Sequence, residues 1–512
     1  MSKSTKIILA ILAVGILYRL LLTANGNFLF NMDNARDMVD LREMIVVGKL
    51  RLTGPTSAIE GLFNGPAWYY LLAVPFALSG GDPYASILME IVLWAIGGFF
   101  LLKLVSKWDK WLILPIGTVW VASDYIVLTN LYAFNPNPVT LLAPLFIYLL
   151  VEYLEKKKAI YGICAWILAG LFFNFEMNFG VFTPPIILAS IVFTGNSKLF
   201  KQKWFWVGVA SFVVMLLPQA IFDLRHQFIM SKALLRHIFE NSSVSFSVAE
   251  RFQSTQKSFY NTFQATLMNH QLFTRIILVL FIPVIYWFLK KKKKDVIVCV
   301  SFLLISIPFL GYLILPVTVN PWHLGGEMAV SLILIGYLLK EFTERNVLGK
   351  TISVLLTVSI VFFGLSNIGN FFFNHWGKTS FDPSLFKNEI SAIDYVYEYA
   401  KGENFKVYTY LPSVYDYPYQ YLFWWYGQKE YGYIPGEYVY SPNKPVYIPS
   451  QDKYQGRKDN FSGLVFLIKE PDRIKMRQAW ENDFKDMEFI SKGMVGPLEI
   501  EIRKEVKEVI KK

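Results

Sequence analysis

The sequence of 512 residues contains little cysteine and little charge. Its two cysteines, Cys164 and Cys299, both lie inside apolar segments, so we expect neither a disulfide framework nor a metal–thiolate site. Charged residues make up 17% of the chain, whereas soluble proteins average about 25%. No glycine-rich phosphate loop is present, and no small-residue cleavage pattern follows the first apolar block, 7–24. We therefore expect no nucleotide-binding fold, no cofactor and no metal, and a first block that is retained.

Long apolar blocks dominate what is present. Hydrophobic residues make up 54% of the chain, and the mean hydropathy is +0.37. The blocks run for roughly 17 to 25 residues, which is the length that a bilayer requires. The net charge of +11 is not gathered on one polar region, because the lysines stand in short clusters between the blocks. Such clusters are typical of cytoplasmic anchors, so the sequence predicts membrane lipid rather than nucleic acid as a partner.

Following the lysine clusters along the chain predicts an α-helical multi-pass membrane protein with about eleven transmembrane helices. The predicted spans are 7–23, 84–105, 111–128, 139–153, 160–173, 179–193, 204–221, 276–289, 296–315, 329–339 and 351–371. The block Pro66–Leu78 is short, and we interpret it as an interfacial helix anchored by Trp68, Tyr69 and Tyr70. This choice puts every dense lysine cluster on one side. It predicts a cell-membrane protein with a cytoplasmic N-terminus and an extracytoplasmic C-terminus.

The predicted domains are a transmembrane domain, 1–371, with a first outer loop, 25–83, and an extracytoplasmic tail, 372–512. The tail is polar and rich in tyrosine, and no block in it is long enough to span. Its patterns predict a small α/β domain with helices over 388–400 and 472–484 and strands over 406–410 and 464–468. The aromatic stretch 408–426 suits either sugar stacking or a packed core.

The first outer loop carries three aspartates at helical spacing. Asp33, Asp37 and Asp40 share one face of a predicted helix, where their repulsion costs a few tenths of a kcal/mol per pair. Arg36 offsets part of that cost. Two interpretations stay open: a solvated face of an interfacial helix, or a catalytic carboxylate held at the membrane surface.

Several motifs in chain order resemble those of the GT-C glycosyltransferases that use polyprenyl-phosphate sugars. They are Asp33-Asn34-Ala35-Arg36, Gly65-Pro66-Ala67-Trp68-Tyr69-Tyr70, Gly80-Gly81-Asp82-Pro83, Asn135-Pro136-Asn137-Pro138, and Leu217-Pro218 followed by Phe222-Asp223-Leu224-Arg225-His226. The chain is most similar to glycosyltransferase family 39 and to the protein O-mannosyltransferase and aminoarabinose-transferase group, over roughly residues 1–340. The resemblance implies a GT-C type fold and a polyprenyl-phosphate-linked sugar donor.

The sequence departs from the family pattern at two positions. Asn34 and Asn137 stand where many members have a second acidic residue, which disfavours a two-carboxylate or metal-dependent scheme. Asp33 is then the candidate general base for an attacking hydroxyl. Arg36, Arg225 and His226 are candidates for binding the phosphate of the donor, because a leaving phosphate develops negative charge. Interfacial snorkelling of Arg225 and a wet loop around His226 are the alternatives.

Further polar residues could line a substrate cavity. These candidates are Asp37, Glu90, Asp124, Asn137, Glu176, His323 and Glu327. Helix capping or pairing between helices explains several of them equally well. The sequence thus predicts an inverting glycosyltransferase acting outside the cytoplasm on an unknown glycan, lipid or protein acceptor. The alternatives are a polytopic lipid or sugar transporter or flippase, and a scaffold that acts through its tail.

Overall fold

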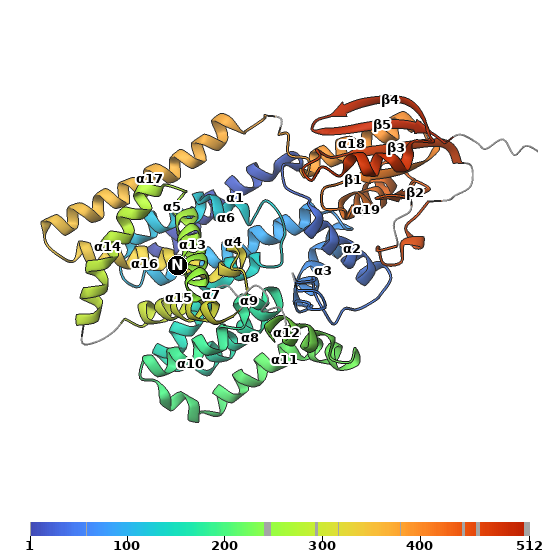
Figure 1. Ribbon diagram of the computed structural model, residues 1–512. Coiled ribbons are helices and arrows are strands. Elements are labelled where there is room, and N and C mark those ends of the chain that lie inside the picture. The colour runs from blue at the N-terminus through green and yellow to red at the C-terminus, as the bar shows by residue number, and fades with distance from the viewer. Residues whose placement is uncertain are drawn as a thin grey trace, which may run out of the picture. The chain divides into compact units, whose positions relative to one another are not determined.

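The computed structural model describes residues 2–57, 59–239, 247–291, 295–315, 317–378, 380–442, 446–456 and 461–505 (Figure 1). The chain divides into two compact units. The helical unit comprises Met1–Arg19, Arg51–Leu71 and Leu88–Phe373. The tail unit comprises Leu20–Leu50, Leu72–Ile87 and Asn374–Lys512.

Long helices run through the helical unit, and short turns of helix connect them. In chain order they are α1 (Lys3–Thr23), α3 (Ala67–Ser79), α4 (Tyr84–Val105), η2 (Lys110–Leu112), α5 (Ile113–Ala122), α6 (Asp124–Leu128), α7 (Asn137–Lys156), α8 (Ala159–Phe175), α9 (Met177–Gly180), α10 (Thr183–Phe193), η3 (Ser197–Lys201), α11 (Lys203–Arg225), α12 (Ile229–Phe239), α13 (Val248–Thr266), α14 (Gln271–Lys290), α15 (Val296–Ile314), η5 (Pro321–Leu324), α16 (Gly325–Thr343) and α17 (Val347–Asn374). The first residues of α4 and the last residues of α1, α3 and α17 belong to the tail unit.

Eight helices of the described chain are long and apolar enough to cross a membrane, which confirms a multi-pass architecture. They are α4, α7, α11, α14, α15, α17 and two continuous stretches, α1 with η1 and η5 with α16. Three further predicted spans are shorter apolar helices, at 110–122, 159–175 and 177–193. Because each of these is shorter than the roughly 20 residues of a typical span, the total of about eleven crossings stays a prediction.

The predicted interfacial segment forms the helix α3, but its aromatic residues do not all serve as anchors. Trp68 and Tyr69 are 0% and 1% exposed, so they pack inside the protein and cannot reach lipid headgroups. The Trp68 ring meets Phe175 edge-on, with centroids 6.5 Å apart. Only Tyr70 of the three stays exposed, at 42%. The prediction of a three-residue aromatic anchor is therefore wrong for Trp68 and Tyr69.

Close helix packing in the helical unit depends on small residues. α8 and α11 lie side by side. A Cβ atom at Gly170 of α8 would stand 2.7 Å from the Met215 side chain, and one at Gly208 of α11 would stand 2.4 Å from Trp166. Contacts between membrane helices rest on van der Waals packing of this kind, since lipid supplies no hydrophobic driving force between helices.

The tail unit contains a mixed sheet of five strands in the order β2-β1-β3-β5-β4. The strands are β1 (Asn404–Tyr410), β2 (Glu437–Val439), β3 (Phe461–Lys469), β4 (Glu488–Val495) and β5 (Leu498–Lys504). β1 pairs in parallel with β2 and β3, whereas β5 runs antiparallel to β3 and β4. Gly496, with φ +57°, stands in the two-residue turn between β4 and β5, where a positive φ favours glycine.

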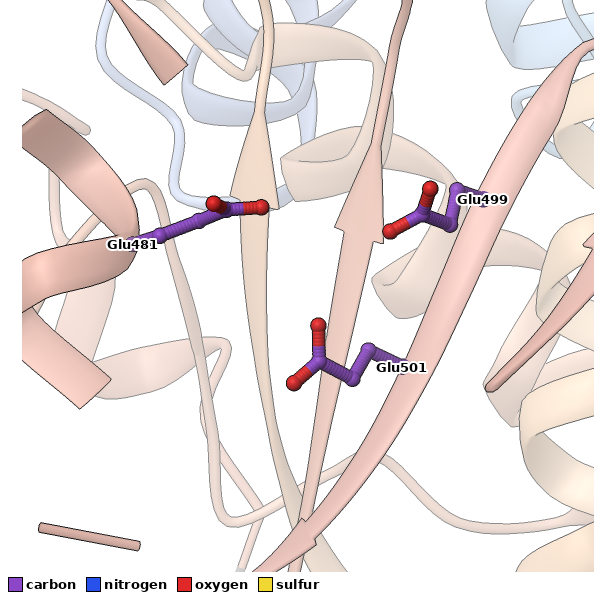
Figure 2. Close-up of side chains that lie close together, drawn as sticks. All are labelled: Glu481, Glu499 and Glu501. Carbon is purple, nitrogen blue, oxygen red and sulfur yellow. The ribbon is translucent and has the colours of Figure 1, made fainter. Parts of the chain in front are cut away.

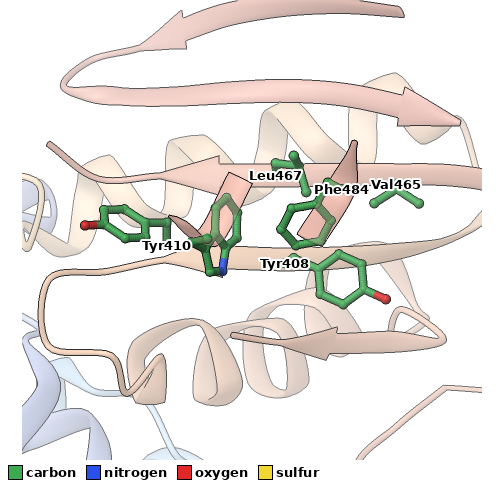
Figure 3. Close-up of a cluster of buried hydrophobic side chains, with 6 residues drawn as sticks. Tyr408, Tyr410, Val465, Leu467 and Phe484 are labelled. Atoms are coloured by element: carbon green, nitrogen blue, oxygen red, sulfur yellow. The ribbon is translucent and has the colours of Figure 1, made fainter. Parts of the chain in front are cut away.

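Helices cover both faces of this sheet. On one face Tyr408, Tyr410, Val465 and Leu467 pack against Phe484 of η8 (Asn482–Phe484), as Figure 3 shows. Trp480 of α20 (Arg477–Glu481) belongs to the same cluster. On the other face α18 (Phe386–Ala400) packs against β3, β4 and β5. Alternate strand residues therefore point into two separate apolar layers, as expected for a buried sheet.

Two segments of the first outer loop pack with the tail rather than with the spans. These segments are Leu20–Leu50, which includes η1 (Ala24–Gly26) and α2 (Met32–Val46), and Leu72–Ile87. The backbone of Phe30 donates to Ser384 at 2.8 Å, and the backbone of Phe386 donates to Phe28 at 2.9 Å. The sequence predicts a single division of the chain, at residue 371. The compact units instead join parts of the loop to the tail.

The predicted tail elements over 388–400, 406–410 and 464–468 correspond to α18, β1 and β3. The predicted helix over 472–484 is present only as the short α20 and η8. Elements that no pattern indicated are β2, β4, β5, α19 (Tyr417–Leu422), the π-helical η6 (Phe423–Tyr431) and η7 (Gln451–Lys453).

Two of the buried carboxyl groups in the tail unit, those of Glu389 and Glu470, have raised pKa values. Glu389, in the first turn of α18, is fully buried, and within the described residues neither of its oxygens has a hydrogen-bond partner. Glu470, just after β3, is 6% exposed. Burial raises the pKa of Glu470 to about 7 and the pKa of Glu389 well above its usual range. The folded protein therefore holds protons that the unfolded chain gives up near its ordinary carboxyl pKa.

The raised pKa values of these two carboxyl groups predict that the tail unit loses stability as pH rises. Stability is fully present below the unfolded pKa, about 4.3, and falls as pH climbs through the folded values. A tenfold difference in proton affinity between the folded and unfolded chain corresponds to about 1.4 kcal/mol. We expect the melting temperature to decrease from pH 5 to pH 8, and Glu389→Gln to flatten that decrease. The exposed Glu398→Gln in the same helix is the matched control, and a pH profile equal to wild type in Glu389→Gln would contradict the assignment.

Candidate functional site

The helix α2 presents the acidic motif of the first loop. Its N-cap is Asn31, whose side-chain oxygen accepts from the backbone of Asp33 at 3.0 Å and from that of Asn34 at 3.4 Å. An Asx residue at this position satisfies amides that a helix start leaves unpaired. Asp33 follows in the first turn, where the helix dipole favours a negative charge. The local sequence thus determines where α2 begins and places Asp33 in its first turn.

Arg36 links two of the three aspartates. Its Nη1 lies 3.0 Å from Asp33 Oδ1, and its Nη2 lies 2.9 Å from Asp37 Oδ1. The side chain of Asp33 is 36% exposed, whereas those of Arg36 and Asp37 are 14% and 1% exposed. Within the described chain no group bonds Asp33 Oδ2. Asp33 is therefore an oriented carboxylate with one oxygen open to a ligand, and Asp37 is a buried support for Arg36.

A tyrosine of the tail unit lies beside this motif. Tyr417, at the start of α19, interacts electrostatically with Asp40 and Arg36, and burial raises its pKa to about 12. Its ring stacks on Tyr415, with centroids 5.7 Å apart. The sequence left open whether the aromatic stretch 408–426 stacks on sugars or forms a packed core. Most of the stretch is buried in the core. Tyr415 stays 44% exposed.

The other predicted phosphate ligands belong to the helical unit. Arg225 is the last residue of α11 and is exposed, and His226 follows it. The His226 ring stacks on Phe222 at 4.0 Å, and its Nδ1 lies 2.8 Å from the Phe222 carbonyl oxygen. Asp223 accepts from the backbone of Met230 at 2.6 Å and so holds the start of α12. Binding of a donor phosphate by Arg225 and His226 stays a prediction.

A pocket of about 410 Å³ opens in the helical unit. Its walls come from α6 and the turn after it, the start of α7, α13 and η5. They carry aromatic rings and side-chain amides, including those of Tyr125, Tyr132, Trp322, Asn261 and Asn269. Aromatic rings and a few convergent polar groups are typical of small-molecule sites.

One predicted cavity residue of this unit lines the pocket, and another bonds a lining residue. Asn137 lines it and donates to the carbonyls of Thr129 and Tyr132, at 3.0 and 2.9 Å. Asp124 accepts from Asn269, a lining residue, at 3.3 Å. Through these hydrogen bonds, Asn137 and Asp124 hold parts of the pocket wall in place.

Three further predicted residues contact lining residues of the pocket without lining it themselves. Glu90 is fully buried and faces the amide of Asn137. His323 meets Trp322 edge-on at 5.8 Å, and Glu327 interacts electrostatically with Tyr125. Glu176 lies farther away and accepts from the Asn178 amide at 2.6 Å.

Burial raises the pKa of Glu176 to about 7. Because its oxygen also caps the short helix α9 through the backbone of Asn178, a structural role explains this residue. Of the predicted cavity residues in this unit, Asn137 alone lines the pocket. Glu90, Asp124, His323 and Glu327 each face a lining residue, and Glu176 bonds Asn178, which does not line it.

Two buried arginines were not among the site residues predicted from the sequence. Arg19, inside α1, is 0% exposed, bonds Asn130 at 2.6 Å and lies 3.8 Å over the Trp94 ring. Arg42, in α2, is also 0% exposed. An arginine within an apolar block was a usable signal for Arg19, because a charge there is costly and usually functional or paired. Arg42 gave no such signal, since its surroundings in sequence are polar.

One group of three acidic side chains in the described chain could hold a metal ion: Glu481, Glu499 and Glu501 (Figure 2). Lys469, 2% exposed, places its Nζ 2.7 Å from Glu481 and 3.3 Å from Glu499, and it also bonds Glu501. Arg477 adds a second cation at 3.0 Å from Glu481. The lysine ammonium thus stands where a metal would bind, and we interpret the cluster as an ion-pair network.

Comparison with known proteins agrees with the motif resemblance. Residues 64–222 match the family described as dolichyl-phosphate-mannose-protein mannosyltransferase. No curated protein sequence matches the chain. Two crystal structures of ArnT from Cupriavidus metallidurans have a similar fold. The apo structure gives a TM-score of 0.62 at 11% identity, covering 98% of each chain.

The second ArnT structure is bound to undecaprenyl phosphate. It gives a TM-score of 0.60 at 10% identity and covers 97% of this chain and 98% of that chain. At such identity the likeness establishes the fold. The chain therefore has the GT-C glycosyltransferase fold, and the resemblance indicated by its motifs is confirmed by this fold and by the family match of residues 64–222.

Proposed function

We propose that the protein is an inverting glycosyltransferase that moves a sugar from a polyprenyl phosphate to an acceptor hydroxyl on the extracytoplasmic side of the membrane. The observation that carries the proposal is the geometry of Asp33. Its carboxylate is held by Arg36 through Oδ1, while Oδ2 is open to a ligand within the described structure. The similarity of fold to ArnT bound to undecaprenyl phosphate supports the class of donor.

Each of the candidate residues has a role in the proposed transfer reaction. The acceptor oxygen attacks the anomeric carbon, and the bond from that carbon to the phosphate oxygen breaks with both electrons leaving on the phosphate. Asp33 takes the proton of the acceptor hydroxyl, which a carboxylate within hydrogen-bond reach can do. A single displacement from the face opposite the phosphate inverts the anomeric configuration. Because the phosphate gains negative charge, Arg36, Arg225 and His226 are proposed to stabilise it.

The pocket in the helical unit is proposed to bind part of the substrate. Aromatic rings such as Trp322 and Tyr132 stack on sugar rings or contact isoprene units, and the amides of Asn261 and Asn269 can bond hydroxyls. Arg19 bonds Asn130 and lies over the Trp94 ring, and Glu90 is fully buried, so these two residues outline no polar path through the described spans. A transporter or flippase therefore receives less support than a transferase.

Right-side-out membrane vesicles from cells that produce the protein provide the test. They receive polyprenyl phosphate carrying a radiolabelled sugar, with mannose and aminoarabinose donors compared side by side. We expect the label to move onto endogenous acceptors, with release of unsubstituted polyprenyl phosphate, only when the protein is present. Label that crosses the bilayer while still attached to its lipid, with none on an acceptor, would establish a flippase instead.

A further inference from the structure

Arg42 and Asp33 occupy opposite faces of the same helix. They are nine positions apart in α2, which is about two and a half helical turns and about 13 Å along the axis. Asp33 is partly exposed, whereas Arg42 is 0% exposed. A substrate that reaches Asp33 therefore cannot touch Arg42. Any effect of Arg42 on transfer must act through the position of the helix.

The tail holds the Arg42 guanidinium on several sides. Nη1 donates to the Gln420 carbonyl at 3.3 Å. The guanidinium carbon lies 3.6 Å from the Tyr454 ring centroid and 5.2 Å from that of Trp424. Cation–π contacts gain strength when they are desolvated. Arg42 thus docks α2 against the region that follows β1.

Gln420 also connects Arg42 to the sheet through its side chain. Its side-chain nitrogen donates to Asp416 Oδ2 at 3.0 Å, and that oxygen also accepts from the Thr409 hydroxyl of β1 at 3.0 Å. Gln420 and Asp416 are each 1% exposed. Since these contacts are buried and linked, α2 is tied to a strand of the sheet through rigid groups.

Further contacts fix both ends of this loop region. Before α2, Leu29 and Leu385 form an antiparallel bridge. At the end of α2, Glu43 Oε1 accepts from the Ser450 hydroxyl at 2.7 Å. Near the start of α4, the Trp425 indole donates to the Gly80 carbonyl at 3.0 Å. The tail therefore holds the loop before, along and after the helix that carries Asp33.

We propose that the C-terminal segment of the tail unit, Asn374–Lys512, positions the Asp33 helix for transfer, and that Arg42 is the positioning residue at the centre of this contact. The inference rests on the proposed transferase function and assigns the tail its part in it. A carboxylate that must meet an attacking hydroxyl tolerates little displacement, since a shift of about 1 Å can cost about 100-fold in rate.

Arg42→Met tests the proposal in the full-length protein. We expect kcat for transfer to fall by about 10–100-fold, while KM for the lipid donor changes little and the melting temperature stays near that of wild type. Arg42→Lys should restore part of kcat, because it keeps the cation between the two rings. Arg473→Met, the same change at an exposed arginine of the tail, is the control. An unchanged kcat in Arg42→Met would overturn the proposal.

A reversible crosslink covers the case in which Arg42→Met folds poorly. Leu29 and Leu385 oppose each other in an antiparallel bridge between flanking hydrogen bonds, which places their Cα atoms about 4.5 Å apart and suits a disulfide. We expect Leu29→Cys/Leu385→Cys to stay active when oxidised, and to raise kcat in the Arg42→Met background until a reductant is added. Loss of activity on oxidation in the wild-type background would show that the docked state is not the active one.

The two proposals fail in different ways. If wild type moves no sugar, the transferase assignment fails. If wild type transfers sugar and depends on Asp33 but not on Arg42 or the crosslink, only the positioning role fails.

Discussion

Replacing Asp33 by asparagine is expected to slow sugar transfer by about 10²–10⁴-fold, the usual contribution of a general base. Asparagine keeps the size of the side chain and its hydrogen bond to Arg36 but cannot accept the proton of the attacking hydroxyl. Initial rates with a labelled polyprenyl-phosphate donor measure the effect. Because Asp33 is 36% exposed and exposed ion pairs contribute about 0–1 kcal/mol, the melting temperature should stay nearly constant.

Asp40→Asn is the matched control for this experiment. It makes the same chemical change on the same helix, seven positions or nearly two turns from Asp33, and should retain most of the activity. Asp33→Glu should keep the base but misplace it, and so give an intermediate rate. If Asp33→Asn and Asp40→Asn are both fully active, Asp33 is not the general base and another residue must serve.

Replacing Lys469 by methionine is expected to destabilise the tail unit by about 3 kcal/mol. Removing one partner of a buried ion pair costs about 3–5 kcal/mol, and the lower end applies because Glu481 and Glu499 are 34% and 22% exposed. Without the ammonium between them, the three carboxylates would repel one another. Pulse proteolysis of the full-length protein measures the loss.

The same variant should acquire a response to calcium. The three carboxylates already lie within 4.8 Å of one another, and calcium binds carboxylate oxygens at about 2.3–2.6 Å. Millimolar calcium should restore part of the stability of Lys469→Met and leave wild type unchanged. The exposed Lys492→Met of β4 is the control. A variant as stable as wild type, with or without calcium, would show that the lysine does not balance this cluster.

The sequence allowed the fold class and the first-loop motif to be predicted, because both follow from local patterns. Apolar blocks indicate spans through their length, and the spacing of Asp33 and Asp37 indicates a helix in any context. The similarity of the motifs to the GT-C families then indicated the fold that the comparisons confirm.

The docking of the loop on the tail could not be predicted in the same way. Arg42 and Gln420 are separated by 378 positions, and no periodicity connects residues so far apart. Trp68 and Tyr69 show the same limit: a Trp-Tyr pair suits an interfacial anchor, but burial against a distant helix cannot be seen in the local sequence. The strand β5 was missed because Glu499, Glu501 and Arg503 lie in the ion-pair network, which blurs the alternation. The strand β4 was missed because none of its residues is buried.

The bridge between Leu29 and Leu385 bears on the order in which the chain can assemble. Its two residues are separated by more than half of the polypeptide. Contacts of such long range form late because closing the loop between them costs entropy. During synthesis the helix that carries Asp33 emerges early, yet its partners at 384–386, 420 and 454 are made last. A chain that stops short of them has all its spans and its carboxylate but lacks the surface that docks the helix, so transfer activity should begin only when translation is nearly complete.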